Sequence, residues 1–188
     1  MKPITEQFLN ALYARFNFEQ IRINPLELEL YSCDGLQLHN ATPGCVILPE
    51  TTEDISWIVK KCNEFKVPFV PRGAGTGLSG GAVIEDGLII QLSRLNKIIE
   101  IDIPNKCAVV QPGVVNAHLS QEVNSCGFHF APDPSSQIVS TIGGNVAENA
   151  GGPHTLKYGV TVNHVLGQKV ILPSGEIIQI GDKSRFNI

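Results

Sequence analysis

The chain has 188 residues, of which 43% are hydrophobic and 17% charged, and these proportions describe an ordinary globular protein with a buried core. Its formal net charge of −4 argues against a nucleic-acid partner, because such a partner would require a basic face. The apolar stretch near the N-terminus is interrupted by Glu6, Asn10 and Arg15. We therefore expect neither a signal peptide nor a transmembrane segment, but a cytoplasmic protein.

The cysteines and histidines predict no metal site. The five cysteines are widely spaced and contain no C-x-x-C pair, which indicates reduced structural thiols rather than a disulfide framework. The five histidines show no spacing typical of metal ligands.

The first half of the chain predicts a strand–helix–strand unit. Apolar residues at helical spacing indicate a short amphipathic helix over residues 4–16. A strand over residues 45–48 precedes a helix whose start resembles a capping box, with Thr51 and Asp54 three residues apart. The apolar run 67–70 is a second strand, so this order predicts a βαβ unit in a partly parallel sheet.

The second half predicts more strands and one further helix. Residues 87–92 read as a strand, and residues 98–101 and 107–111 read as a hairpin. Apolar residues over 115–126 lie at helical spacing, and Gly127 follows where a C-cap would lie. These elements indicate an α+β fold.

Residues 131–164 are rich in Gly, Pro, Asn and Ser and follow neither the helical nor the strand period. An irregular tract of this length in a compact domain is usually functional. Residues 168–172 and 176–180 then predict a closing hairpin.

The most informative segment is the glycine-rich run over residues 71–81, directly after the expected strand 67–70. Its glycines can adopt positive φ angles and turn successive backbone N–H groups toward one anion, for which a diphosphate is the natural occupant. A second glycine cluster covers residues 143–145 and 151–152. Two separate clusters suggest one extended ligand that is held in more than one place.

Several common phosphate sites do not fit this run. Gly75, Gly77 and Gly80 match the G-x-G-x-x-G spacing, but residues 81–87 lead to another strand without the helix that a Rossmann site requires. No Lys-Ser or Lys-Thr pair follows the glycines, so a P-loop is excluded. A loop that binds diphosphate through backbone amides remains, and a mobile surface turn is the alternative.

These segments together resemble a known family. The run 71–81, the Ala-Pro-Asp-Pro-Ser-Ser segment 131–136 and residues 141–152 are similar to the PCMH-type FAD-binding domain, and residues 31–35 and 156–159 also fit. Within that superfamily the chain is most similar to the D-lactate and D-2-hydroxyacid dehydrogenase group, which includes the flavoprotein subunit of glycolate oxidase.

The resemblance implies FAD as the cofactor, with its diphosphate on the first glycine loop and its flavin along the later segments. It implies no catalytic residue and no metal ligand within this chain. His154, Lys157 and Tyr158 stay open between a role near the flavin and simple packing. The implied cofactor-binding residues are Arg72, Gly73, Ala74, Gly75, Thr76, Ser79, Gly80 and Gly81 for the diphosphate, Pro132, Asp133, Pro134 and Ser135 for the flavin and ribityl chain, and Thr141, Gly143, Gly144, Asn145, Gly151, Gly152 and Val170 for the isoalloxazine.

The resemblance also implies the domain organisation. An N-terminal helix and linker over residues 1–41 would precede a first FAD-binding subdomain over 42–103 and a second, incomplete one over 104–188, with FAD between them. Members of the group are more than twice as long, so we expect a fragment, a truncated reading frame or one piece of a split enzyme.

The implied activity is oxidation of a small 2-hydroxy acid, glycolate or D-lactate, to the 2-oxo acid. The substrate would be held by a cap domain, and electrons would pass to partner subunits of a glycolate oxidase complex or to the respiratory chain, with peripheral attachment at the inner membrane as an option. The alternatives are a non-catalytic or degenerate nucleotide-binding remnant and an FAD reductase of the enolpyruvyl-glucosamine type.

Overall fold

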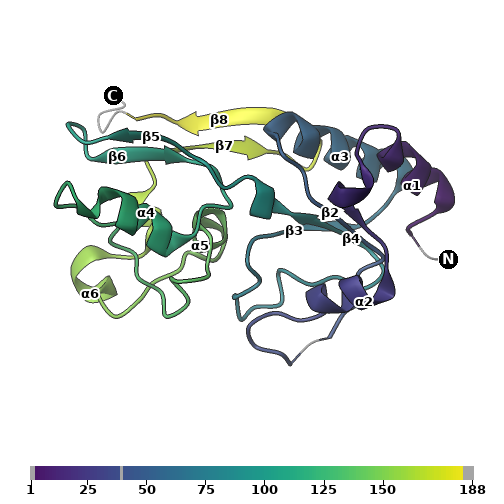
Figure 1. The fold of residues 1–188 in the computed structure, drawn as a ribbon, viewed down its shortest axis with the longest axis horizontal. Helices are drawn as coiled ribbons and strands as arrows, with labels where there is room; N and C mark the ends of the chain where they lie inside the picture. The colour runs from purple at the N-terminus through teal and green to yellow at the C-terminus, as the bar shows by residue number, and fades with distance from the viewer. Residues whose placement is uncertain (1–2, 39, 184–188) are drawn as a thin grey trace. The chain divides into compact units, whose positions relative to one another are not determined.

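The computed structural model describes residues 3–38 and 40–183, and the chain divides into two compact units (Figure 1). Unit 1 comprises Met1–Arg94 and Ile171–Ile177, and unit 2 comprises Leu95–Val170 and Ile178–Ile188. The expected division after residues 41 and 103 stays a prediction.

Unit 1 is built on a four-stranded sheet in the order β1-β2-β4-β3. The three strands β2, β4 and β3 are parallel, and β1 is antiparallel to β2. The helix α3 connects β2 to β3, so the predicted βαβ unit in a partly parallel sheet is confirmed. The elements of unit 1 are α1 (Glu6–Tyr13), η1 (Phe18–Gln20), β1 (Ile21–Arg22), α2 (Pro25–Leu28), η2 (Glu29–Tyr31), β2 (Cys45–Ile47), α3 (Thr52–Phe65), β3 (Phe69–Arg72), β4 (Leu88–Gln91) and η3 (Leu92–Arg94).

Helices cover both faces of this sheet (Figure 1). Alternate residues of the central strands point to opposite faces, so Ile47, Leu88 and Ile90 pack with α1 and α3, whereas Val46 and Ile89 pack with Leu28 of α2. All five strand side chains are almost fully buried. A central strand that is buried on both faces reads as a continuous apolar run, as it does here.

The helix α3 begins and ends where local chemistry dictates. The capping box is confirmed: the Asp54 amide donates to Thr51 Oγ1 at 3.0 Å, and the Thr51 amide donates to Asp54 Oδ2 at 3.1 Å. Arg15 pairs with the other carboxylate oxygen of Asp54 at 2.9 Å. At the other end Lys66 has φ 55°, and the Val67 amide donates to Cys62 O. This bond closes the helix, so residue 67 is not yet part of a strand. The sequence predicted that the strand starts at residue 67, and β3 starts two residues later.

Unit 2 contains the remaining elements. The predicted hairpin is confirmed as β5 and β6, which are antiparallel with a bulge between Ile98 and Glu100. The predicted helix is confirmed as α4, with Gly127 at φ +77° after it. The strands β7 and β8, which cross the boundary between the units, form a second two-stranded sheet. The elements are β5 (Ile98–Asp102), β6 (Cys107–Val110), α4 (Asn116–Asn124), α5 (Ile142–Glu148), α6 (Thr155–Tyr158), η4 (Thr161–His164), β7 (Gly167–Ile171) and β8 (Ile177–Gly181).

The tract 131–164 differs from its expected irregular conformation, because it contains α5, α6 and η4. The side chain of Thr141 caps α5 by accepting a hydrogen bond from the Gly144 amide at 3.2 Å. Two glycines in the first turn each disfavour a helix by about 1 kcal/mol, which hides α5 from an analysis based on propensity. Asn149 then ends the helix in the left-handed region, at φ 50°.

No helix among the described residues is long and apolar enough to cross a membrane.

Candidate cofactor site

The glycine loop 73–81 leaves the end of β3 and is tied to unit 1 at three points. The Gln91 side chain donates from Nε2 to Gly73 O at 2.9 Å. The Gly80 amide donates to Asp34 Oδ2 at 2.9 Å, and the Gly35 amide donates to Gly77 O at 3.0 Å. Side chains and backbone of neighbouring segments therefore anchor the loop at three points.

Arg72 lies beneath this loop and is buried, with 7% exposure, rather than solvated. Its guanidinium donates to Ala82 O and Cys33 O, each at 2.9 Å, and lies 5.7 Å from the centre of the Tyr31 ring. These partners are neutral carbonyls, and no ion pair to Arg72 is found among the described residues. The Asp34 carboxylate interacts with this charge at longer range, and because the guanidinium has no direct ion pair it can also attract a bound anion.

Gly75 is required by this arrangement. It has φ +71°, and a Cβ on it would overlap the Arg72 guanidinium. A side chain at Gly75 would thus be strained by the backbone and would displace the arginine.

Asp34 is a positioning residue that the sequence analysis did not single out. Its carboxylate accepts hydrogen bonds from the amides of Leu36, Gln37 and Gly80. Burial would raise the pKa of Asp34, but the bonds from Gly80 and the other amides outweigh it, so the pKa of this carboxyl lies below its ordinary value. The sequence analysis included residues 31–35 in the family resemblance, but it did not reveal the contact of Asp34 with a loop 46 residues later.

The amides of residues 73–78 are the free donors of the loop. Within the described residues, none of them donates a hydrogen bond to another protein group. Gly80 has φ +77°, and a Cβ on it would meet no atom within 4 Å. A fixed loop with unpaired amides and a buried guanidinium below it fits a diphosphate.

Unit 2 holds the predicted cofactor-binding residues of segments 132–135 and 141–152. Asn116, at the start of α4, connects this helix to the chain just before and within these segments. Asn116 is fully buried, donates from Nδ2 to Pro132 O at 3.0 Å, and its amide donates to Ser140 O at 2.9 Å. It therefore ties α4 to both ends of segment 132–140. Sequence analysis missed Asn116, because a single Asn beside an apolar helix stripe carries no distinct signal.

The glycines of this group differ in what surrounds them. A Cβ on Gly143 would lie 2.6 Å from Pro112 Cβ, and one on Gly152 would overlap the Asp133 carbonyl, so both are needed for close packing. A Cβ on Gly151 would lie 2.7 Å from Thr155 Oγ1. Gly144 is different, because its Cβ would meet only Thr141 Oγ1, at 3.1 Å. Gly144 thus leaves space open beside the first turn of α5.

Three buried polar atoms in the same region lack a hydrogen-bond partner among the described residues: Asn145 Nδ2, Asn116 Oδ1 and Ser140 Oγ. An unpaired buried polar group costs about 1–3 kcal/mol, so such groups usually meet a water or a ligand. Open space at Gly144 together with these atoms fits a polar ring system that is bound by residues 132–145.

The structure brings some predicted residues together and leaves others apart. Asp133 lies against Gly152, and Thr141 caps the turn that contains Gly143 and Gly144. The remaining predicted residues include exposed loop positions at Ser79, Gly81 and Ser135, half-buried Gly73, Ala74 and Thr76, buried Pro132 and Pro134, and half-buried Val170 on β7. Whether each of them contacts FAD stays a prediction.

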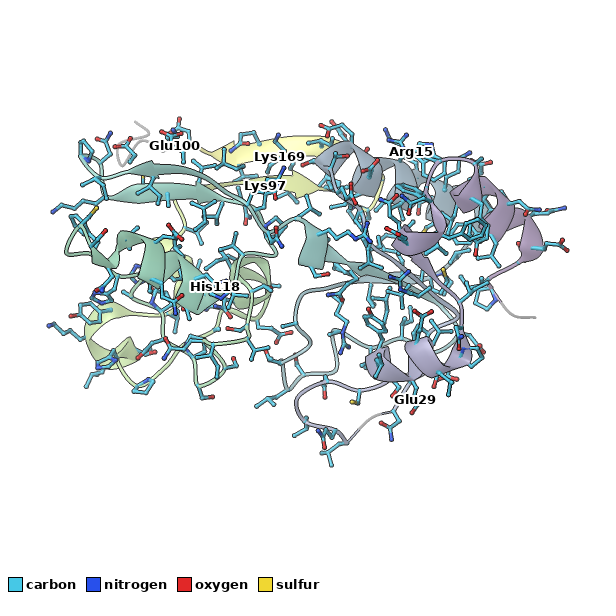
Figure 2. The ribbon with its side chains drawn as sticks, viewed as in Figure 1. Arg15, Glu29, Lys97, Glu100, His118 and Lys169 are labelled. Atoms are coloured by element: carbon cyan, nitrogen blue, oxygen red, sulfur yellow. The ribbon has the colours of Figure 1, made fainter. Side chains whose placement is uncertain are left out.

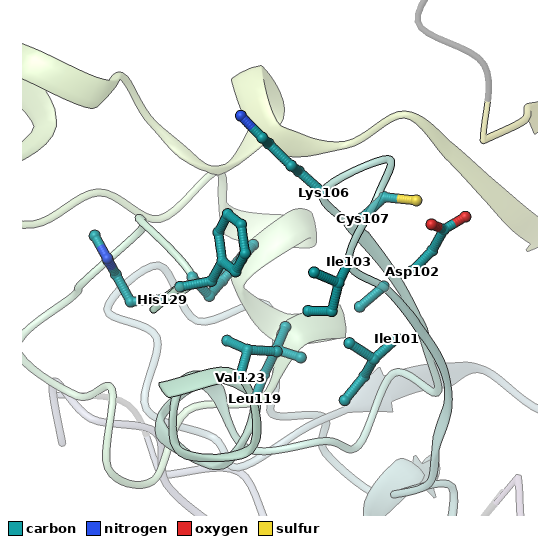
Figure 3. Close-up of a pocket in the computed structure, with 11 residues that line it drawn as sticks. Ile101, Asp102, Ile103, Lys106, Cys107, Leu119, Val123 and His129 are labelled. Carbon is teal, nitrogen blue, oxygen red and sulfur yellow. The ribbon is translucent and has the colours of Figure 1, made fainter. Parts of the chain in front are cut away.

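A small cavity of about 110 Å³ lies elsewhere in unit 2, between the β5–β6 hairpin and α4 (Figure 3). Its walls are mainly apolar, with Leu119, Val123 and Phe130 among them. It contains none of the predicted site residues, so it is separate from the candidate cofactor site.

A partly parallel sheet that feeds a glycine loop with free amides, followed by a second glycine segment, defines an FAD-binding domain. The chain belongs to this family: the model described as "FAD binding domain" matches residues 43–181. The PCMH-type FAD-binding domain predicted from the sequence is thereby confirmed, with FAD as the family's cofactor.

Curated relatives narrow the similarity further. The glycolate oxidase subunit GlcD of Bacillus subtilis (strain 168) is 46% identical over 183 residues, which cover 97% of this chain and 38% of that protein. A D-lactate dehydrogenase of Anaerostipes hadrus is 43% identical over 142 residues, which cover 75% of this chain and 30% of that protein. The chain thus spans less than half the length of these relatives.

Among solved structures, alkyldihydroxyacetonephosphate synthase matches with a TM-score of 0.86 and 21% identity, over 98% of this chain and 36% of that chain. At this identity the match shows the fold alone. It agrees with the predicted α+β class.

Proposed function

We propose that this chain forms the FAD-binding portion of a flavin-dependent dehydrogenase that oxidises a small 2-hydroxy acid, glycolate or D-lactate, to the 2-oxo acid. The observation that carries the proposal is the 46% identity with a glycolate oxidase subunit over 97% of this chain. Because the chain matches 38% of that relative, the activity belongs to a longer protein or an assembly that includes it.

The residues of the chain have binding and orienting roles in this proposal. The amides of residues 73–78 hold the diphosphate, and the buried Arg72 supplies positive charge beneath it. Segment 132–135 and the first turn of α5 hold the flavin. Asn116 fixes segment 132–135. Bound FAD supplies the hydride acceptor for the oxidation.

We assign the remaining groups to parts of the relatives that the chain does not match. These groups are the acceptor for the proton of the substrate hydroxyl and the cation that binds the substrate carboxylate. Partner subunits that accept the electrons, and a cytoplasmic location with peripheral membrane attachment through them, are likewise proposed by analogy with the relatives.

A chimera tests the proposal. Residues 1–183 would replace the matched segment of the Bacillus subtilis relative, and glycolate and D-lactate oxidation would be followed with a dye as electron acceptor. We expect retained flavin absorbance and turnover of one of the acids, and no turnover by the isolated 188-residue chain. A folded chimera that neither retains flavin nor oxidises either acid would contradict the proposal and support a degenerate remnant.

A further inference from the structure

Asp133 directs its carboxylate to one partner on a different segment. His154 Nδ1 lies 2.5 Å from Asp133 Oδ2, and the His154 amide donates to Asp133 Oδ1 at 3.4 Å. Both oxygens thus contact one residue, 21 positions later in the chain. Asp133 is among the predicted cofactor-binding residues, and whether its carboxylate contacts FAD stays a prediction.

The backbone around His154 is built to reach Asp133. Gly152 packs against the Asp133 carbonyl so closely that no Cβ fits, and the Gly152 amide donates to Thr155 Oγ1 at 2.8 Å. The segments 132–135 and 151–155 are therefore joined by a backbone contact and by the side-chain pair. A histidine on an unattached surface loop would show neither feature.

The charges near this pair are few. Tyr158 lies 6.5 Å from the His154 ring, and its own ring contacts Lys157 Nζ at 4.8 Å and the His129 ring at 6.1 Å. His164 Nε2 lies 2.9 Å from Tyr158 O. Asp133 is the carboxylate that directly faces the imidazole. The hydrogen bond from His154 lowers the pKa of Asp133 below its ordinary value, so the carboxylate stays charged at neutral pH.

We propose that His154 is a positioning residue for the cofactor site, which holds the Asp133 carboxylate and thereby fixes segment 132–135 in its FAD-binding conformation. This inference rests on the proposed role of that segment in binding FAD. His154 acts through Asp133 and takes no part in the chemistry.

Two substitutions test the side-chain hydrogen bond of His154. His154→Leu removes the side-chain donor, whereas His154→Arg keeps one. His118→Leu is the matched control, because His118 is exposed on α4 and its side chain has no hydrogen bond or ion pair recorded within residues 3–38 and 40–183 (Figure 2). The dissociation constant for FAD would be measured by flavin fluorescence.

We expect His154→Leu to weaken FAD binding about threefold to fivefold, because the imidazole is 68% exposed and solvent limits the strength of the pair. His154→Arg should bind FAD as wild type does. Equal binding by wild type and His154→Leu, or failure of His154→Arg to restore binding, would overturn the proposal.

Hydrogen exchange in the cofactor-free chain separates this proposal from the proposed function. The Gln137 amide, near segment 132–135, donates a hydrogen bond to Pro134 O. The Gly152 amide, in segment 151–155, donates to Thr155 Oγ1. Both should exchange faster in His154→Leu than in wild type, and at the wild-type rate in His154→Arg. If wild type binds no FAD, the proposed cofactor role fails. Unchanged exchange in His154→Leu would overturn the positioning role of His154.

Discussion

Asn116 Nδ2 donates a hydrogen bond to Pro132 O at 3.0 Å, and Asn116 is fully buried. Through this bond a side chain of α4 fixes the start of the segment that we assign to the flavin. The Pro132 carbonyl has no other hydrogen-bond donor among the described residues.

Asn116→Ala should therefore lower the free energy of unfolding by about 1–3 kcal/mol, because it leaves a buried carbonyl without a partner. Urea unfolding would measure this change. Asn124→Ala at the exposed end of the same helix is the control and should change stability by less than about 0.5 kcal/mol. Equal effects of the two substitutions would contradict the role of Asn116.

Gly144→Ala should separate stability from cofactor binding. Its Cβ would lie 3.1 Å from Thr141 Oγ1 and near no other atom, so the gain in helix propensity is offset by this tight contact and the free energy of unfolding should change by less than about 1 kcal/mol. FAD affinity should fall at least about tenfold, because the methyl group enters the space assigned to the isoalloxazine.

Gly143→Ala supplies the comparison, since its Cβ would clash with Pro112. It should destabilise the protein by about 1–3 kcal/mol. Thermal unfolding and FAD titration of both variants check the pair. Undiminished FAD affinity in Gly144→Ala would remove the first turn of α5 from the cofactor site.

Acid should loosen the glycine loop through Asp34. The pKa of Asp34 is depressed in the folded state, so its stabilising contribution is present above the ordinary carboxyl pKa of about 3.9 and is lost as pH falls through the lower folded value. The Gly80 amide should lose protection against hydrogen exchange in that acidic range. Asp34→Asn should show less protection at neutral pH and no such transition. A Gly80 amide whose protection is the same in both proteins would contradict the assignment.

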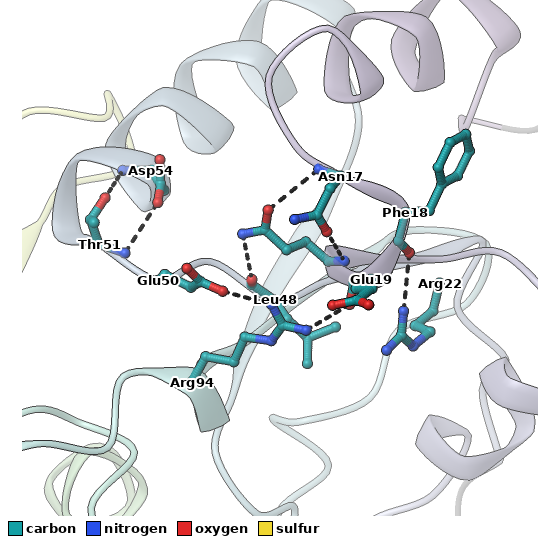
Figure 4. Close-up of polar contacts among 10 residues, drawn as sticks. Asn17, Phe18, Glu19, Arg22, Leu48, Glu50, Thr51, Asp54 and Arg94 are labelled. Atoms are coloured by element: carbon teal, nitrogen blue, oxygen red, sulfur yellow. Dashed lines mark hydrogen bonds and ion pairs between the residues drawn. The ribbon is translucent and has the colours of Figure 1, made fainter.

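Arg72→Lys should be far more damaging than the same change at Arg94. Lysine cannot reproduce the planar fork that donates to Ala82 O and Cys33 O, so we expect a loss of about 2–3 kcal/mol in stability and a weaker affinity for FAD. Arg94 pairs with Glu50 and with Glu19 O in a more exposed setting (Figure 4), and Arg94→Lys should cost less than about 1 kcal/mol. Chemical denaturation of both variants measures the difference, and comparable losses would show that Arg72 is not a buried support of the loop.

The sequence predicted the parts of this fold that local patterns determine. Short apolar runs and helical periodicity located the β2–α3–β3 unit, and the Thr51–Asp54 capping box located the start of α3. The glycine run 71–81 predicted a loop without a following helix, and none is found before β4.

What the sequence could not predict depends on contacts between distant residues. Arg72 is a buried support because it meets the carbonyl of Cys33, 39 residues earlier, and Asp34 positions Gly80 across a similar separation. The helix α5 escaped prediction because its glycines oppose helix formation locally, whereas the Thr141 cap and the close approach to Pro112 favour it in the folded chain.

The most direct test of the account is a titration of the isotopically labelled chain with ADP and FAD, followed through its amide resonances, with adenosine as the ligand that lacks phosphate. We predict that ADP and FAD shift the amides of residues 73–78, whose N–H groups have no partner in the described chain, and that adenosine leaves them unchanged. Resonances of this loop that do not respond to millimolar ADP or FAD, or that respond equally to adenosine, would contradict the claim that the loop binds the diphosphate of FAD.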